Sequence, residues 1–166
     1  MSDQQVSKSA VSPKSVASKP VLKLSSFLPY RLNHLAETVS RSFSRIYADT
    51  YGIGIPEWRV LATLGEFKAM TARDISQATS MHKTKVSRAV AALEKRDLLE
   101  RDKNRDDQRE QTLRLSAQGN AMYEEIVPKA LAYSKSLEDA LTEEQKTVLN
   151  DVFERLHQAA LSRENG

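Results

Sequence analysis

The fold of this chain is decided by residues 71–116, which read TARDISQATSMHKTKVSRAVAALEKRDLLERDKNRDDQREQTLRLS. Thr71, followed three residues later by Asp74, predicts a capped helix start. A three-residue joint at 79–81 leads into a second predicted helix over 82–97. The hydrophobic period then changes to that of two short strands separated by a long polar loop, which predicts a β-hairpin.

The predicted helix over 82–97 has two faces of different chemistry. Its apolar positions follow the i, i+3, i+4, i+7 spacing of a core-facing stripe, and they are Val86, Ala89, Val90 and Leu93. The other face carries short polar and basic side chains and no acidic one, namely Lys83, Thr84, Lys85, Ser87 and Arg88. Such side chains at the N-terminal end of a helix can reach base edges in the DNA major groove. The order of elements therefore predicts a winged helix-turn-helix that binds double-stranded DNA through these five residues.

The loop of the predicted hairpin is dense in charge. It carries Arg105 and Arg109, and the tip of such a hairpin can lie along the minor groove, where an arginine meets strong negative potential. Three acidic residues of the same loop, Asp102, Asp106 and Glu110, reduce its net attraction for phosphates. The alternative is that helix and loop are ordinary solvated surfaces, but their combination favours DNA binding.

The rest of the chain is predicted to be helical apart from its start. Residues 1–26 contain eight serines and no aromatic residue, a composition that predicts a disordered tail. Further helices are expected over 29–50, from Pro56, from Ser116 to about Leu141, and from the capping box that begins at Thr142. The fold class is therefore mainly α, a winged helix-turn-helix with six helices, one β-hairpin wing and an α-helical dimerisation domain.

The helices outside the DNA-binding unit carry more apolar side chains than one small unit can bury. These are Val39, Phe43, Ile46, Leu137, Val148, Val152, Phe153 and Leu156. A second copy of the chain can cover them, and a two-fold dimer reads a pseudo-palindromic operator. A monomer with a larger core is the alternative. The expected organisation is a tail (1–26), a first dimerisation helix (27–55), a winged helix-turn-helix lobe (56–115) and C-terminal dimerisation helices (116–166).

Composition argues against several other classes of protein. The chain has no cysteine, which excludes disulfides and thiolate metal sites. It has no apolar run near the roughly 18 residues of a membrane span and no signal-peptide core, so we expect a cytoplasmic protein without a membrane partner. We find no Gly-rich phosphate loop or nucleophile elbow, so we expect neither an enzyme nor a cofactor. His34 and His157 each lie three residues from a glutamate, a spacing common by chance on helices, and we expect no metal site.

The chain resembles the MarR family of transcriptional regulators over residues 28–160. The resemblance is carried by the segments 56–61, 82–88 and 93–96, and by a wing signature D-x-R…L-[ST]-x-x-G formed by Asp107, Arg109 and residues 113–119. The wing signature is the most specific element. One position departs from the family pattern, because Asp97 follows the recognition helix where the family usually has glycine. Aspartate tolerates a left-handed turn less well than glycine does.

The resemblance implies a homodimer with intertwined first, fifth and sixth helices, and a fourth helix that reads DNA. It implies that Arg109 enters the minor groove and that Asp107 holds the wing by pairing with a basic partner. It also implies a site for small aromatic anions between the dimerisation helices and the DNA-binding lobe. The expected lining of that site is Arg31, His34, Arg41, Trp58, Arg59 and Tyr123.

The segments 28–31 and 56–59 are similar to the branch of the family that controls aromatic-acid catabolism, which includes sensors of hydroxycinnamoyl-CoA thioesters. The implied function is that of a repressor released from its operator by a small aromatic carboxylate or its CoA thioester, such as p-coumaroyl-CoA. A general DNA-packing protein and a metal-responsive regulator of the same fold are the alternatives. A core position for Trp58 and a structural ion pair for Arg59 also stay open.

Overall fold

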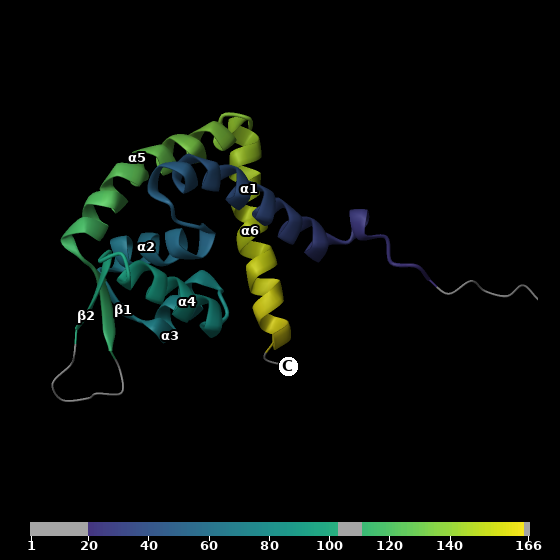
Figure 1. The fold of residues 1–166 in the computed structure, drawn as a ribbon. Coiled ribbons are helices and arrows are strands. Elements are labelled where there is room, and N and C mark those ends of the chain that lie inside the picture. Colours follow the sequence, from purple (N-terminus) through teal and green to yellow (C-terminus); the bar gives the residue numbers. More distant parts are fainter. Residues whose placement is uncertain (1–19, 103–110, 165–166) are drawn as a thin grey trace, which may run out of the picture. The chain divides into compact units, whose positions relative to one another are not determined.

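The structure, a computed structural model, describes residues 20–102 and 111–164. The chain forms two compact units, residues 1–36 and 37–166. Within the described residues the elements are η1 (Leu24–Ser26), α1 (Leu28–Tyr51), α2 (Ile55–Phe67), β1 (Ala69–Thr71), α3 (Ala72–Thr79), α4 (Lys83–Glu94), β2 (Leu99–Asp102), β3 (Thr112–Leu115), α5 (Ala117–Glu138) and α6 (Glu143–Glu164) (Figure 1). The mainly α winged helix-turn-helix with six helices is thereby confirmed.

The first unit contains the 3-10 turn η1 and the beginning of α1. The turn is closed by a hydrogen bond from the Phe27 amide to the Leu24 carbonyl, at 3.1 Å. The sequence predicts a disordered tail through residue 26, but residues 24–26 form this turn because local backbone hydrogen bonds close it. Within α1, the rings of Tyr30 and His34 stack at a centroid distance of 6.2 Å. Residues 1–19 of the predicted tail lie outside the described residues.

The core of the second unit lies among α2, α3, α4 and the sheet. The stripe predicted for α4 is buried as expected, with Val86 and Leu93 fully inaccessible to solvent. Ile75 of α3 and Leu61 of α2 join it in one cluster. Burying a side chain of this size stabilises the fold by about 1.5–3 kcal/mol. The same cluster includes Tyr47 of α1 and Ile126 of α5, so the core of the lobe that carries α4 continues into the neighbouring helices.

The sheet has three antiparallel strands in the order β1-β3-β2. The predicted hairpin is its β2–β3 pair, with Leu99 opposite Leu115. The third strand, β1, is not predicted by the sequence, because three residues are too few to show an alternating pattern. It pairs Met70 with Leu113, and so it ties the entry of α3 to the wing, meaning β2, β3 and the loop between them.

Helix starts agree with the predicted caps. Thr71 Oγ1 accepts the Asp74 amide at 3.2 Å, and the Asp74 carboxylate accepts the Thr71 amide at 3.3 Å. At the start of α6, Thr142 and Gln145 exchange the equivalent pair of hydrogen bonds. Each pair satisfies amides that have no partner inside the helix.

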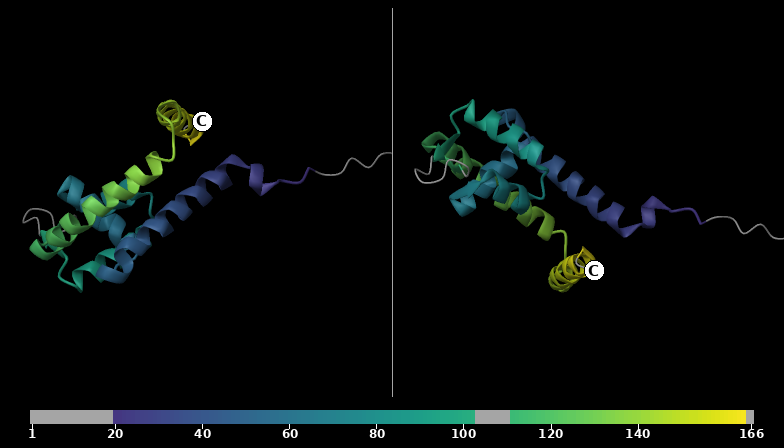
Figure 2. Two further views of the ribbon diagram at one scale, coloured as in Figure 1. Left: turned by 90° about the horizontal axis from the view of Figure 1, so that it is seen from above. Right: turned by 90° about the horizontal axis from the view of Figure 1, so that it is seen from below.

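The two long C-terminal helices differ in their contacts. α5 lies alongside the part of α1 that belongs to the second unit (Figure 2): the Tyr133 hydroxyl donates to the Val39 carbonyl at 3.1 Å, and its ring stacks on Phe43. α6 has no buried residue among those described. Several of its apolar side chains are exposed, namely Val148, Leu149, Val152, Phe153 and Leu161. No helix in the described parts of the chain is sufficiently long and apolar for a membrane span.

Candidate nucleic-acid interface

α4 presents its polar face to solvent. Its buried side is the Val86–Leu93 stripe, and this fixes the rotation of the helix about its axis. All five residues predicted to read DNA are exposed on the opposite side: Lys83, Thr84, Lys85, Ser87 and Arg88. Three are cationic and two are neutral hydrogen-bonding groups. The structure therefore brings these side chains together over the first two turns of one helix.

The N-terminal end of α4 is fixed by its joint to α3. Ser80 closes the joint in a left-handed conformation, with φ of 52°. The Ser76 hydroxyl donates to the Met81 carbonyl at 2.6 Å, and His82 Nδ1 accepts the Thr84 amide at 3.3 Å. His82 is thus the N-cap of α4, because its imidazole satisfies an amide that the helix leaves free.

The C-terminal end of α4 turns at Asp97. The Leu98 amide donates to the Leu93 carbonyl at 3.0 Å, and the Asp97 amide donates to the Glu94 carbonyl at 2.9 Å. This double closure is the Schellman motif, which places the residue at its turn in the left-handed region. Asp97 adopts it with φ of 56°. The turn thus keeps the geometry for which the family usually uses glycine.

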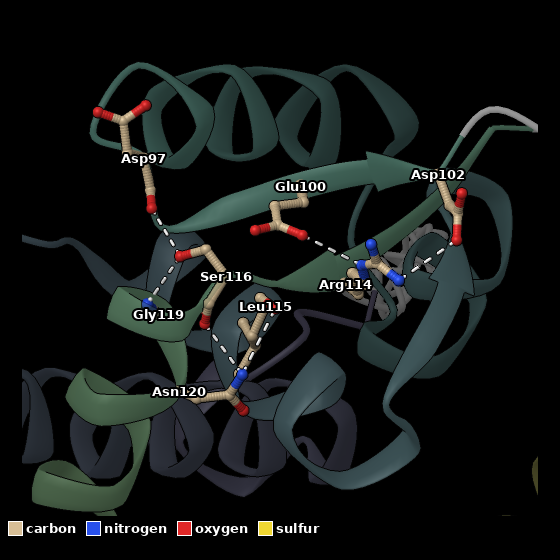
Figure 3. Close-up of polar contacts among 8 residues, drawn as sticks. All are labelled: Asp97, Glu100, Asp102, Arg114, Leu115, Ser116, Gly119 and Asn120. Atoms are coloured by element: carbon tan, nitrogen blue, oxygen red, sulfur yellow. Dashed lines mark hydrogen bonds and ion pairs between the residues drawn. The ribbon is translucent and has the colours of Figure 1, made fainter.

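The L-[ST]-x-x-G part of the wing signature is explained by the joint between β3 and α5 (Figure 3). Ser116 Oγ accepts the Gly119 amide at 3.0 Å and donates to the Asp97 carbonyl at 2.6 Å. A Cβ on Gly119 would lie 2.0 Å from the Leu98 carbonyl oxygen. Ser116 therefore caps α5 and holds the turn after α4 through hydrogen bonds. The absence of a side chain at Gly119 allows the backbone of α5 to approach the backbone of Leu98 closely.

Two arginines at the stem of the wing are held by carboxylates. Arg101 pairs with both carboxylate oxygens of Glu94 on α4 and donates to Gln111 at 2.8 Å. This hydrogen bonding to Glu94 raises the pKa of Arg101. Arg114 pairs across the sheet with Glu100 at 3.2 Å and with Asp102 at 3.3 Å (Figure 3). The pair of Arg101 with Glu94 joins the stem to α4, and the exposed pairs of Arg114 join β3 to β2 and contribute little to stability.

Sequence reasoning missed the roles of Arg101 and Arg114. The alternation of charge across the two strands was the available signal, since opposite charges on paired strands attract. The three residues predicted at the wing tip, Arg105, Asp107 and Arg109, lie outside the described residues.

A cavity of about 260 Å³ lies beside this lobe, among α1, α2 and α5. It is lined by Val39, Ser40, Phe43, Tyr47, Ile55, Trp58, Arg59, Tyr133, Ser134 and Leu137. Four of these residues are aromatic, and their ring centroids lie 5.1–5.5 Å apart in the pairs Phe43–Tyr47, Phe43–Trp58, Tyr47–Trp58 and Phe43–Tyr133. The lining is therefore mainly apolar and aromatic.

Few polar groups reach the cavity, and one carries a formal charge. Arg59 Nη2 donates to Ser40 Oγ at 3.3 Å. Burial raises the pKa of the Tyr47 phenol to about 12, against the opposing effect of the Arg59 guanidinium. The polar groups of the lining are thus the Arg59 guanidinium, the hydroxyls of Ser40 and Ser134, and the phenols of Tyr47 and Tyr133.

Four of the six predicted ligand-binding residues belong to the second unit: Arg41, Trp58, Arg59 and Tyr123. Trp58 and Arg59 line the cavity. Arg41 is exposed and pairs with Glu37 at 3.4 Å. Tyr123 lies against Gly65, where an added Cβ would be 2.4 Å from the ring. Neither residue is among those that line this cavity, and the expected role of both in ligand binding stays a prediction.

The other two predicted residues, Arg31 and His34, belong to the first unit. There they line a hollow together with Tyr30 and the side chains of Leu28 and Leu35. Sequence reasoning missed Ser40, Tyr47 and Tyr133. The first two lie three residues before and four residues after Phe43, so their helical spacing was a usable signal. Within the described residues, no group of three potential metal-ligating side chains is close enough to hold a metal ion.

Comparison with known proteins adds to these observations. The sequence profile of the MarR family matches residues 51–110. A MarR family transcriptional regulator from Silicibacter pomeroyi DSS-3 is 30% identical, with a TM-score of 0.67 over 82% of this chain and 99% of that one. A MarR/EmrR family regulator from Acinetobacter sp. ADP1 is 25% identical, with a TM-score of 0.77 over 85% and 99%.

A third structure is that of NadR in complex with 4-hydroxyphenylacetate. It is 25% identical, with a TM-score of 0.68 over 82% of this chain and 96% of that one. The fold, the joint between β3 and α5 and these likenesses agree with the resemblance found in the sequence. The chain is a member of the MarR family of transcriptional regulators.

Proposed function

We propose that the chain is a homodimeric repressor that binds a pseudo-palindromic operator and leaves it when a small aromatic carboxylate occupies the cavity. The observation that carries this proposal is the orientation of α4. The helix buries one stripe in the core of the lobe and exposes a face with three cations and no acidic side chain. A helix fixed in this way can enter the major groove without rearrangement of its own lobe.

The exposed face of α4 contains both kinds of group that operator binding needs. Lys83, Lys85 and Arg88 suit phosphate oxygens or guanine, and they supply salt-dependent affinity. Thr84 and Ser87 are short donors and acceptors that suit base edges. The proposal assigns sequence preference to this mixture, and it assigns minor-groove contacts to Arg105 and Arg109 of the wing, with Asp107 holding the tip.

The exposed apolar face of α6 supports the dimer. Val148 is 54% exposed and Phe153 is 51% exposed in the single chain. Contiguous apolar surface of this kind marks an interaction site. In the proposed dimer a second copy covers this face, and the two α4 helices are set about one turn of DNA apart.

The cavity supports an effector with a single aromatic ring and one carboxylate. Trp58 and its aromatic neighbours can stack a ring, and Arg59 can pair with a carboxylate. A volume of about 260 Å³ suits one ring better than a CoA thioester. NadR, which shares the fold and a quarter of the residues, binds 4-hydroxyphenylacetate. The proposal therefore ranks the free acid above p-coumaroyl-CoA.

Release from DNA requires the effector to favour a dimer whose α4 helices no longer match adjacent major grooves. A coupling free energy of about 1–3 kcal/mol would lower operator affinity roughly 5–150-fold. This range is large enough to detect in a binding titration and small enough for one ring and one ion pair to supply.

The test is an anisotropy titration with the duplex that the protein selects from a random pool, against a scrambled duplex of equal length. Each titration is repeated with 4-hydroxyphenylacetate and with p-coumaroyl-CoA. Trp58 is the one tryptophan of the chain, so its emission reports occupancy of the cavity directly. The proposal predicts that affinity for the selected duplex exceeds affinity for the scrambled duplex about 10³-fold or more. It also predicts that 4-hydroxyphenylacetate lowers this ratio. Equal affinity for both duplexes would instead identify a general DNA-packing protein.

A further inference from the structure

One arginine joins the end of α4 to the loop between α1 and α2. Arg96 Nη2 donates to the Tyr51 carbonyl at 2.6 Å, and Arg96 Nη1 donates to the Gly52 carbonyl at 3.0 Å. These carbonyls lie at the C-terminal end of α1, where no further helical amide can reach them. The negative end of the helix dipole favours a guanidinium there. Gly52 terminates the helix with φ of 63°.

The residue that accepts from Arg96 is itself held by α5. The Tyr51 hydroxyl donates to Glu125 Oε2 at 3.1 Å, and Lys129 Nζ donates to the Tyr51 hydroxyl at 2.8 Å. The Lys129 ammonium also lies 4.9 Å from the centre of the Tyr51 ring. Glu125 and Lys129 are one turn apart on α5, so the Tyr51 hydroxyl is hydrogen-bonded to two positions of the same helix.

Together these contacts form a continuous path, which we call the strut: Glu125 and Lys129 on α5, Tyr51 and Gly52 at the end of α1, and Arg96 after α4. α4 has twelve residues, so its reading end lies roughly 18 Å from the strut at 1.5 Å per residue. A tilt of about 10° at the strut would move the reading end by about 3 Å, which is close to the spacing of base pairs.

We infer that Arg96 is a positioning residue for DNA reading, and that the strut transmits shifts of α1 and α5 to the recognition helix. The inference rests on the proposed role of α4. It assigns Arg96 no contact with DNA, because its guanidinium is occupied by the carbonyls of Tyr51 and Gly52. A direct phosphate contact by this exposed cation is the competing explanation, and the salt dependence of binding separates the two.

The first test compares Arg96→Met with Lys95→Met, which removes the same charge from the neighbouring exposed position. Both are titrated with the selected duplex and the scrambled duplex over a series of salt concentrations. Arg96→Met is expected to weaken binding to the selected duplex about tenfold beyond the control. Affinity for scrambled DNA and the salt slope should match those of the control. Arg96→Lys, which can still reach one carbonyl, should recover part of the loss.

Two results would overturn the inference. Equal behaviour of Arg96→Met and Lys95→Met on both duplexes would mean that Arg96 positions nothing. A salt slope reduced by about 0.9 more than in the control would mean that Arg96 binds a phosphate. Both variants are first compared by urea unfolding, so that titrations are run where each is fully folded and a loss of stability does not imitate a loss of specificity.

The second test needs no DNA, so it distinguishes failure of the strut from failure of the proposed function. Tyr51→Phe keeps the ring and removes the hydroxyl that Glu125 and Lys129 hold. Tyr30→Phe, at an exposed position of the same helix, is its control. If the strut is continuous, amide hydrogen exchange should rise in residues 93–98 at the end of α4 in Tyr51→Phe only. Unchanged exchange there would show that α5 and α4 are not linked through Tyr51.

Discussion

α4 and α6 are both amphipathic in sequence, yet they differ completely in what the single chain does with their apolar faces. α4 buries Val86, Ala89, Val90 and Leu93, and contacts at both of its ends hold it in place. α6 is 22 residues long and buries none of those described. The difference shows that a hydrophobic stripe predicts that a helix face will be buried, but it does not predict which element will cover that face. For α4 the partner is the same chain, and for α6 we propose a second copy.

The largest effect is expected from Gly119→Ala, at the joint between the lobe that carries α4 and α5. The new Cβ would lie 2.0 Å from the Leu98 carbonyl oxygen, which is a backbone atom, so the backbone itself would have to shift. We expect a loss of roughly 3 kcal/mol or more in the free energy of unfolding, measured by urea denaturation. Gly54→Ala is the matched control, because its Cβ meets the flexible end of Glu57. Equal losses for the two variants would contradict this account of the wing signature.

The α6 side of the comparison is tested by Val152→Glu. A charge left unpaired in an apolar interface costs about 3–5 kcal/mol, so the dimer dissociation constant should rise about 100-fold or more. Sedimentation measures this change, and urea unfolding of the lobe should be little altered. Asn150→Glu adds the same charge on the opposite side of α6. If both variants stay dimeric, the exposed face of α6 is not the interface.

A smaller effect is expected where the lobe meets the cavity. Arg59→Met should weaken binding of 4-hydroxyphenylacetate about tenfold or more, because it removes the charged partner of the carboxylate. Quenching of Trp58 emission measures the affinity. Arg41→Met is the control, since Arg41 is exposed and pairs with Glu37 outside the cavity. The cavity assignment would be refuted if both substitutions weakened binding equally.

The smallest effect concerns pH. Burial raises the pKa of Tyr47 to about 12, so the native chain keeps a proton that the unfolded chain releases near pH 10. The stability that this neutral phenol contributes is fully present below pH 10 and falls as the pH rises from about 10 to about 12. Tyr47→Phe should remove this part of the decline. Absorbance titration of the native protein should show one tyrosine that ionises near pH 12, and this ionisation should be absent from the variant. If the variant still shows it, the tyrosine with the raised pKa is not Tyr47.

Much of the fold could be predicted because its signals are local. The stripe of α4 and the caps at Thr71 and Thr142 each depend on residues a few positions apart. β1 was missed because its pairing with β3 depends on residues more than forty positions away. A strand of three residues is too short to show the alternation of apolar and polar residues from which a strand is predicted.

The lining of the cavity was harder to predict than the exposed face of α4 for the same reason. A helical face is defined by spacing along one helix, whereas the cavity is defined by which faces of α1, α2 and α5 meet. Trp58 and Arg59, which line the cavity, were predicted from the resemblance to the family and not from their own pattern. Tyr133 comes from α5, and Tyr123 turns away to cover Gly65. Charge and aromaticity alone could not tell these two tyrosines apart.

The central claim is that a dimer of the chain holds its two α4 helices at a fixed separation, and that together they bind one operator. Its most direct test is the affinity for the selected duplex against the same duplex with five base pairs inserted between its half-sites. Half a turn of DNA moves one half-site to the other side of the helix. The account predicts that affinity falls toward that of scrambled DNA. Undiminished affinity for the lengthened duplex would contradict a two-fold reading of the operator.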